Sequence, residues 1–361
     1  MRIMYNEKSR QNGYIVDFYI MSGDKIVGRW ENETFILVDN TLAPMYLANT
    51  GNVRRWLETR AIDYHRANSR LLKKALRLKE KDDINTVISV YAATITDNYW
   101  IKPFDSALTY NDVRFDNDYF AGLALRGDYD NFNKAAYSKR AHTPELTNTG
   151  SFEKCWRLKD GEWWMVKTAD HKQQFSEIFI CELGKYFGFN MAEYVRGAKS
   201  VMTKDFTGNG SYNFEPAYSF MGDNEDYAAV INKLREIAPQ VIPDYVRMIF
   251  MDTIAANPDR HTFNFGLLRD AETGKIVSLA PNFDNNMALI ARDYPKNIQR
   301  IKDVLIDYFN DLLKFDPPLK KFIPLLSEED IRVVLKKVNM KVKTDIVTRF
   351  IMNGYNHINR V

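Results

Sequence analysis

The order in which two hydrophobic patterns follow each other constrains this chain more than any other feature of its sequence. Apolar and polar residues alternate over 14–21, 25–30 and 34–38, with a Ser-Gly-Asp turn at 22–24 between the first two segments. This period of two predicts a small antiparallel meander. From 51 to about 79 apolar residues recur every three or four positions, which predicts one or two helices after the strands.

The composition is that of a globular protein. Its 361 residues are too many for one hydrophobic core and predict roughly two to three domains. The two cysteines, Cys155 and Cys181, supply neither a disulfide framework nor a thiolate metal site. No signal-peptide pattern and no run of about 20 apolar residues is present. We therefore expect a cytoplasmic protein with no membrane partner.

The segment 54–81 carries a local excess of positive charge. Ten Lys or Arg stand there against Glu58, Asp63 and Glu80, which leaves +7, whereas the whole chain carries only +3. Such a segment can contact the phosphates of a nucleic acid. Long cationic side chains also cover ordinary solvated helix faces. A weak nucleic-acid contact through Arg54–Lys81 is therefore one of two open interpretations.

A second series of strands and helices follows the turn-rich segment 142–150, where we place a domain boundary. The patterns predict strands over 163–168, 193–203, 264–268 and 275–279 and helices over 171–187, 224–237 and 243–257. The Gly- and Asn-containing segment 207–213 is expected to act as a hinge. Ser327 and Asp330 are spaced as a capping box at the start of a further helix.

Three polar side chains around the predicted hairpin carry the pattern of a phosphoryl-transfer site. Asp259 follows a predicted helix, Asn264 stands at the start of the hairpin, and Asp284 lies in the turn after it. Phosphoryl transfer needs a group that orients or deprotonates the attacking hydroxyl, and hard oxygen ligands that hold magnesium against the nucleotide phosphates. The order and spacing indicate Asp259 as the base and Asn264 and Asp284 as metal ligands.

Each of these residues also has a structural interpretation. Aspartates and asparagines between a helix and a strand often cap backbone groups. His261, in the same loop, is a candidate contact to the nucleotide, but its ring also suits a hydrogen-bonded role that fixes the loop, because magnesium prefers acid oxygens to imidazole. The joint order of Asp259, Asn264 and Asp284 favours the chemical interpretation for those three.

The same residues resemble a known family. DRHTFN at 259–264 is similar to the DxHxxN motif of the HipA-like kinases and to the DRHxxN motif of phosphatidylinositol kinases, and APNFD at 280–284 resembles the metal-binding segment of the HipA-like group. Upstream, GSFEKCW at 150–156 resembles that family's phosphate loop, WMVK at 164–167 its strand lysine and SEIF at 176–179 its helix glutamate.

The resemblance implies an α+β fold of the protein-kinase type, with two lobes and ATP between them, preceded by an N-terminal α+β extension. The domains would be an N-terminal region over 1–145, a small-lobe core over 146–206 and a helical lobe over 207–361. ATP and Mg²⁺ would be the cofactors and a protein the substrate. A small helix-turn-helix antitoxin would be a separate partner, as is common for HipA-like toxins.

The resemblance also assigns further residues to the nucleotide. Lys167 would neutralise the α- and β-phosphates, and Glu177, in the following helix, would pair with it. The phosphate loop would contribute Gly150, Ser151 and Lys154. The hinge that binds adenine, at the end of the strand before the glycine-containing loop, would contribute Thr203, Lys204 and Asp205.

The chain departs from the family pattern at two places. Its phosphate loop has one glycine, Gly150, and Asp284 is followed by two asparagines instead of Phe-Gly. Hydroxyls cluster in that loop at Thr147, Thr149 and Ser151. In HipA-like kinases a loop hydroxyl can be autophosphorylated, and the cluster gives the hypothesis that this chain inactivates itself in the same way.

Together these features predict an ATP- and magnesium-dependent serine/threonine-protein kinase, able to phosphorylate itself and related to toxin-type regulators. A phosphatidylinositol-type lipid kinase stays open because DRHTFN suits both groups, although no membrane-binding helix supports it. A non-catalytic module that binds a nucleotide or a nucleic acid is the alternative from another class.

Overall fold

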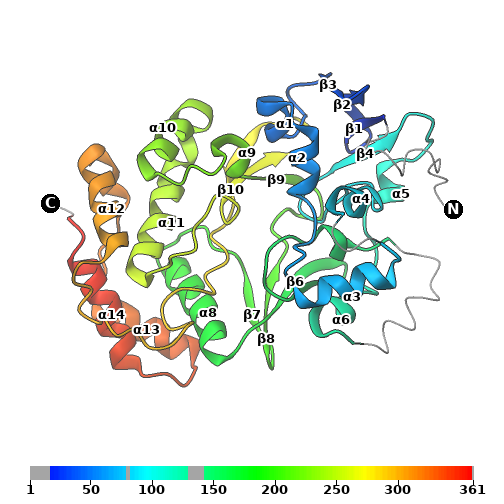
Figure 1. Cartoon of the computed structure of the whole chain (residues 1–361). Helices are drawn as coiled ribbons and strands as arrows, with labels where there is room; N and C mark the ends of the chain where they lie inside the picture. Colours follow the sequence, from blue (N-terminus) through cyan, green and yellow to red (C-terminus); the bar gives the residue numbers. More distant parts are fainter. Residues whose placement is uncertain (1–16, 79–81, 129–141, 360–361) are drawn as a thin grey trace. The chain divides into compact units, whose positions relative to one another are not determined.

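The computed structural model describes residues 17–78, 82–128 and 142–359 (Figure 1). The predicted strand residues 14–16 and the cations Lys79 and Lys81 lie outside these ranges. The chain forms two compact units. Unit 1 contains the described residues up to Trp163 together with 207–213 and 269–275, and unit 2 contains 164–206, 214–268 and the described residues from 276 onward.

Unit 1 contains an antiparallel sheet with the strand order β3-β2-β1-β4. The strands are β1 (Phe18–Ser22), β2 (Lys25–Glu31), β3 (Thr34–Leu37) and β4 (Tyr99–Pro103). The predicted meander is confirmed. The sequence pattern does not predict β4, because Tyr99, Trp100 and Ile101 are all buried and a strand buried on both faces shows no alternation.

Unit 1 also contains several short helices. They are α1 (Met45–Thr50), α2 (Val53–Glu58), α3 (Ala67–Ala75), α4 (Asp83–Ile88), α5 (Tyr110–Val113), α6 (Ala121–Arg126) and the 3₁₀-helix η2 (Pro144–Thr147). Two of them, α2 and α3, confirm the helices predicted after the meander. Trp56 and Leu57 of α2 pack with Trp30 of β2 in one hydrophobic core.

Three cations of the basic segment are buried in unit 1. Arg60 pairs with Asp97 at 2.8 Å, Lys73 pairs with Asp83 at 3.1 Å, and Arg66 is only 2% exposed. These side chains serve the fold, because a buried charge needs a partner. The sequence count therefore overstates the positive charge that this segment presents to a ligand.

The hairpin of β5 (Lys154–Lys159) and β6 (Glu162–Thr168) crosses from unit 1 into unit 2. The left-handed residues Asp160 and Gly161 make its turn. In unit 2, β6 pairs antiparallel with β8 (Ser200–Lys204), and β8 pairs with β7 (Tyr194–Arg196). The single strand predicted over 193–203 is therefore wrong: a turn in which the Gly197 N–H donates to the Ser200 carbonyl divides it into two strands.

The helices of unit 2 confirm the predicted pattern. They are α8 (His171–Tyr186), α9 (Tyr218–Met221), α10 (Tyr227–Ile237), η3 (Pro239–Val241), α11 (Ile242–Ala255), α12 (Val304–Phe315), η4 (Pro317–Phe322), α13 (Glu328–Val338) and α14 (Thr344–Asn356). Asp170 and Gln173 form a capping box at the start of α8, and the predicted box of Ser327 and Asp330 opens α13. Helix α11 packs against α12 and α14 (Figure 1). No helix in the described residues is long and apolar enough to cross a membrane.

A further sheet has the order β11-β10-β9. Its strands are β9 (Tyr212–Pro216), β10 (Gly266–Asp270) and β11 (Ile276–Leu279). The tip of the β10–β11 hairpin, residues 269–275, belongs to unit 1. There the Arg269 guanidinium donates to the Ala43 carbonyl at 2.9 Å and to the Tyr99 hydroxyl at 3.2 Å.

Candidate active site

Lys167 of β6 lies in a buried cluster of charges in unit 2. Its Nζ is 2.6 Å from Oδ1 of Asp284 and 3.9 Å from Oε1 of Glu177. Burial by itself lowers the pKa of a lysine, but the two carboxylates outweigh it and raise the pKa of Lys167. The lysine is therefore held in its charged form between the two acids.

Glu177, on α8, links the strand lysine to the segment 280–286, which we call the metal loop. It is fully buried, and its Oε2 accepts a hydrogen bond of 2.8 Å from the Asn285 N–H. Burial raises the pKa of Glu177, while Lys167 opposes that rise. The predicted pairing of Glu177 with Lys167 agrees with this geometry.

The backbone at Asp284 is in the left-handed region, with φ of 60°. Aspartate tolerates this conformation better than most residues, at some cost in energy. The Asp284 N–H donates to the Tyr194 hydroxyl at 2.9 Å. Tyr194 thus supports the backbone that carries Asp284.

The segment 257–264, which we call the catalytic loop, begins where α11 ends. Ala256 has a φ of 51°, and the Asn257 Oδ1 then accepts from the Asp259 N–H at 3.2 Å. Burial raises the pKa of Asp259, and the negative charge of Asp284 adds to that rise. Asp259 and Asp284 therefore lie close enough to interact electrostatically.

Asn264 is buried, and its Nδ2 donates to the Asp259 carbonyl at 2.9 Å. This bond fixes the amide and leaves Oδ1 as its acceptor atom. The His261 ring accepts from the Phe263 N–H at 3.2 Å through Nδ1. This hydrogen bond agrees with a role of His261 in fixing the loop. A contact between His261 and a nucleotide stays a prediction.

The predicted phosphate loop lies in unit 1. Arg66 donates to the carbonyls of Asn148, at 2.7 Å, and Lys154, at 2.5 Å, so it holds both ends of the loop. Gly150 has a φ of 97°, and a Cβ there would lie 2.5 Å from the Lys154 Nζ. The structure thus brings Gly150 and Lys154 together, with Ser151 exposed beside them. Their role toward phosphate stays a prediction.

The predicted hinge residues Thr203, Lys204 and Asp205 lie at the end of β8 and just beyond it. Thr203 lies opposite Tyr194 in the pairing of β8 with β7. The next residue, Phe206, begins an aromatic cluster that the sequence interpretation missed. Its ring centroid is 5.5 Å from that of Phe214 and 5.4 Å from that of Phe283, the residue before Asp284.

Arg260 is another residue that the sequence interpretation missed. Its guanidinium is buried and pairs with Asp252 of α11 at 2.8 Å. It also donates to carbonyls of the catalytic loop and the metal loop. Its partners, Asp252, Asn264 and Phe283, lie in three separate segments, so the sequence pattern gives no signal for this role.

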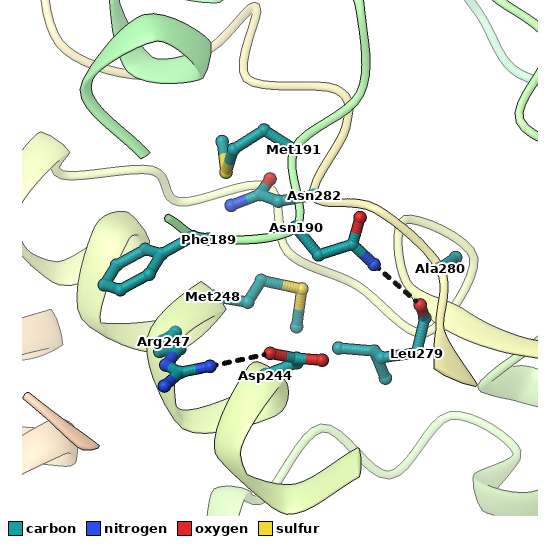
Figure 2. Close-up of a pocket in the computed structure, with 9 residues that line it drawn as sticks. All are labelled: Phe189, Asn190, Met191, Asp244, Arg247, Met248, Leu279, Ala280 and Asn282. Carbon is teal, nitrogen blue, oxygen red and sulfur yellow. Dashed lines mark hydrogen bonds and ion pairs between the residues drawn. The ribbon is translucent and has the colours of Figure 1, made fainter. Parts of the chain in front are cut away.

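A small pocket lies beside the metal loop and is lined by Asn282, Met191 and Met248 among others (Figure 2). Asp244 and Arg247, on α11, form an ion pair of 3.1 Å in its wall. None of the predicted site residues lines this pocket. It is therefore separate from the charge cluster around Lys167.

The two predicted metal ligands, Asp284 and Asn264, both carry oxygen donors. In the described ranges no group of three or more His, Cys, Asp or Glu side chains is placed to hold a metal. Asp284 and Asn264 offer one carboxylate and one amide oxygen. Magnesium in kinases is held by one or two such side chains together with substrate phosphates. Asp284 and Asn264 are therefore the side chains that could hold Mg²⁺ with ATP, and this role stays a prediction.

No protein-family model matches the chain, and no curated protein sequence matches it. Among solved structures it is similar to HipA of Shewanella oneidensis MR-1, in a toxin–antitoxin complex with HipB and operator DNA. The TM-score is 0.51 and the identity 13%, over 94% of this chain and 97% of that one. It also matches the Helicobacter pylori proinflammatory kinase CtkA, with a TM-score of 0.43 and 18% identity over 57% of this chain and 90% of that one. This chain has the kinase-like α+β fold of HipA.

Proposed function

We propose that this protein is an ATP- and Mg²⁺-dependent kinase that transfers the γ-phosphoryl group to a serine or threonine hydroxyl of a protein. One observation carries the proposal: Lys167 lies 2.6 Å from Asp284 and 3.9 Å from Glu177 inside unit 2. The buried lysine lies between two acids, Glu177 on helix α8 and Asp284 on the metal loop. A kinase needs this arrangement to hold the nucleotide phosphates and the metal ion.

Each residue has a role in that reaction. Lys167, held by Glu177, would neutralise the phosphates, and Asp259 would accept the proton of the attacking hydroxyl. Asp284 and Asn264 would hold Mg²⁺, which, when bound, neutralises charge that develops on the phosphate oxygens. The raised pKa of Asp259 makes it a stronger base than an exposed aspartate.

The adenine would bind at the end of β8. The half-buried rings of Phe206, Phe214 and Phe283 offer apolar surface beside the hinge residues Thr203, Lys204 and Asp205, and nucleobases stack on aromatic side chains. Because Phe283 is bonded to Asp284, the same cluster would connect the base to the metal loop.

A transfer assay tests the proposal. The wild type, incubated with Mg²⁺ and ATP labelled in the γ-phosphate, should label itself or a protein substrate on serine or threonine. Asp259→Asn and Asp284→Asn should each reduce the rate at least about 100-fold, without loss of the folded state. Asp226→Asn is a matched control, because Asp226 caps α10 through its side chain and asparagine caps equally well.

Three results would count against the proposal. The first is a wild type without transfer, and the second is undiminished labelling in both site variants. The third is labelling of phosphatidylinositol in preference to protein, which would favour the lipid kinase.

We also propose a small helix-turn-helix protein as a partner. The likeness to HipA extends over 94% of this chain, and that HipA was solved with HipB and DNA. Four cations of the basic segment are exposed in unit 1: Arg55, Arg70, Lys74 and Arg77. If they contact DNA, neutral substitutions there should reduce the salt dependence of DNA binding. Unchanged salt dependence would leave them as ordinary solvated side chains.

A further inference from the structure

We infer that Arg260 is the positioning residue that fixes the two predicted magnesium ligands, Asn264 and Asp284, relative to each other. The inference deepens the proposed function and rests on it. Arg260 itself does not touch the metal or the substrate in this assignment. It acts on the backbone that carries the ligands.

A single nitrogen of Arg260 holds both ligand-bearing segments. Nη1 donates to the carbonyl of Asn264 at 2.7 Å and to the carbonyl of Phe283 at 2.6 Å. The first carbonyl belongs to one predicted ligand, and the second belongs to the peptide bond that leads into Asp284. Two backbone carbonyls nineteen residues apart in sequence are thus tied to one atom.

The second terminal nitrogen holds the metal loop on both sides of Asp284. Nη2 donates to the Oδ1 of Asn282 at 2.9 Å and to the Oδ1 of Asn285 at 3.0 Å. The Asn285 side chain occupies a place where the kinase pattern has an aromatic residue. The departure from Phe-Gly after Asp284 therefore has a structural counterpart, because the amide of Asn285 makes a polar contact that a phenyl ring cannot make.

Asp252 anchors the guanidinium to helix α11. Its two carboxylate oxygens accept from Nε at 2.8 Å and from Nη2 at 2.9 Å, and its Oδ1 also accepts from the Asn257 Nδ2 at 2.8 Å. Arg260 is 7% exposed and Asp252 is 1% exposed. A buried, two-pronged pair of this kind is rigid as well as strong.

These contacts predict that replacing Arg260 changes the Mg²⁺ concentration that nucleotide binding requires. All three guanidinium nitrogens are engaged, and the planar fork of arginine cannot be reproduced by the single ammonium group of lysine. Arg260→Lys would keep the charge beside Asp252 but lose the tie between the loops. Partners that orient metal ligands typically change metal affinity or activity by about 10- to 100-fold when they are replaced.

The test compares Arg260→Lys with Arg300→Lys. Arg300 is also buried, donates to the Thr253 and Ile254 carbonyls of the same helix α11, and pairs with a carboxylate, Asp303. Within the described residues its guanidinium bonds with neither the catalytic loop nor the metal loop. Calorimetry measures the affinity for ADP over a series of Mg²⁺ concentrations, and thermal unfolding measures stability.

We expect Arg260→Lys to raise the Mg²⁺ concentration that half-saturates ADP binding by about 10- to 100-fold. The affinity without Mg²⁺ should stay within about threefold of the wild type, and Arg300→Lys should lower only the stability. If Arg260→Lys does not fold, Asn285→Ala, which removes one of the contacts, takes its place and should raise the Mg²⁺ requirement by a smaller factor.

An unchanged Mg²⁺ requirement in the folded variant, or an equal change in Arg300→Lys, would overturn the inference. The proposed function fails on a different result, namely a wild type that binds nucleotide with Mg²⁺ but transfers no phosphoryl group.

Discussion

The Nζ of Lys167 lies 2.6 Å from Oδ1 of Asp284, and only 3.9 Å from Oε1 of Glu177. One buried cation is therefore shared by two buried or half-buried carboxylates. The same arrangement places the group that would bind phosphate next to the group that would bind magnesium. The contribution of this charge cluster to the free energy of unfolding can be measured without any nucleotide.

Replacement of Lys167 should destabilise unit 2 strongly. Lys167→Met leaves Glu177 and Asp284 without their cation, and removing one partner of a buried ion pair costs about 3–5 kcal/mol. Lys167→Met combined with Asp284→Asn should lose less than the sum of the two single changes, because one unpaired charge is then gone. Urea unfolding of the four proteins measures this coupling. Additive losses would show that the pair is not coupled.

The pH dependence of stability should contain a contribution from Glu145 of η2. Burial raises the pKa of this carboxyl to about 7 from its ordinary 4.5, although it accepts hydrogen bonds from the Trp156 N–H and the Asn148 side chain. The folded state therefore binds the proton more tightly. The contribution to stability is complete below about pH 4.5 and is lost as the pH rises towards about 7.

Glu145→Gln removes that titration. Between about pH 5 and pH 8 the wild type should lose free energy of unfolding relative to Glu145→Gln. Denaturant unfolding at both pH values measures the difference. A difference between the two proteins that stays constant with pH would contradict the raised pKa.

We expect only the exposed hydroxyls of the phosphate loop to be phosphorylated. The Thr147 side chain is buried and donates to the Ala93 carbonyl at 2.7 Å, whereas Thr149 and Ser151 are exposed. After incubation with Mg²⁺ and ATP, mass spectrometry should find phosphate on Thr149 or Ser151 and none on Thr147. Absence of phosphate from all three would reject self-inactivation through this loop.

Gly274, at the tip of the β10–β11 hairpin, should tolerate no side chain. It has a φ of 69°, and a Cβ would lie 1.9 Å from the Thr41 carbonyl oxygen. Gly161 also has a positive φ, 79°, but nothing lies within 4 Å of its Cβ position. Gly161→Ala should cost about 1–2 kcal/mol from backbone strain alone, and Gly274→Ala clearly more. Equal losses in thermal unfolding would show that Thr41 moves aside freely.

The sequence predicted the residues that belong to linear motifs. Local order and spacing indicate Asp259, Asn264 and Asp284, and the family resemblance adds Lys167 and Glu177. The structure brings the lysine, the glutamate and the metal-loop acid together. The helices of unit 2 were found because their apolar spacing is regular. Motif order and apolar spacing depend only on residues that are close together in the sequence, so they can be predicted without the fold.

The supporting residues could not be found in this way. Arg260 is connected to Phe283, and Tyr194 to Asp284, across long separations in sequence, so their roles depend on the fold. Strand β4 was missed because burial on both faces removes its alternation. The pattern over 193–203 predicts one strand instead of the hairpin of β7 and β8, because the turn between them, closed by Gly197 and Ser200, is short.

The most direct measurement of the central claim is a crystal structure of the wild type with ADP and Mn²⁺, which replaces Mg²⁺ and gives an anomalous signal. We expect an anomalous peak at about 2 Å from oxygens of Asp284 and Asn264, with Lys167 turned to the nucleotide phosphates. A metal–nucleotide complex bound away from these three residues would contradict it.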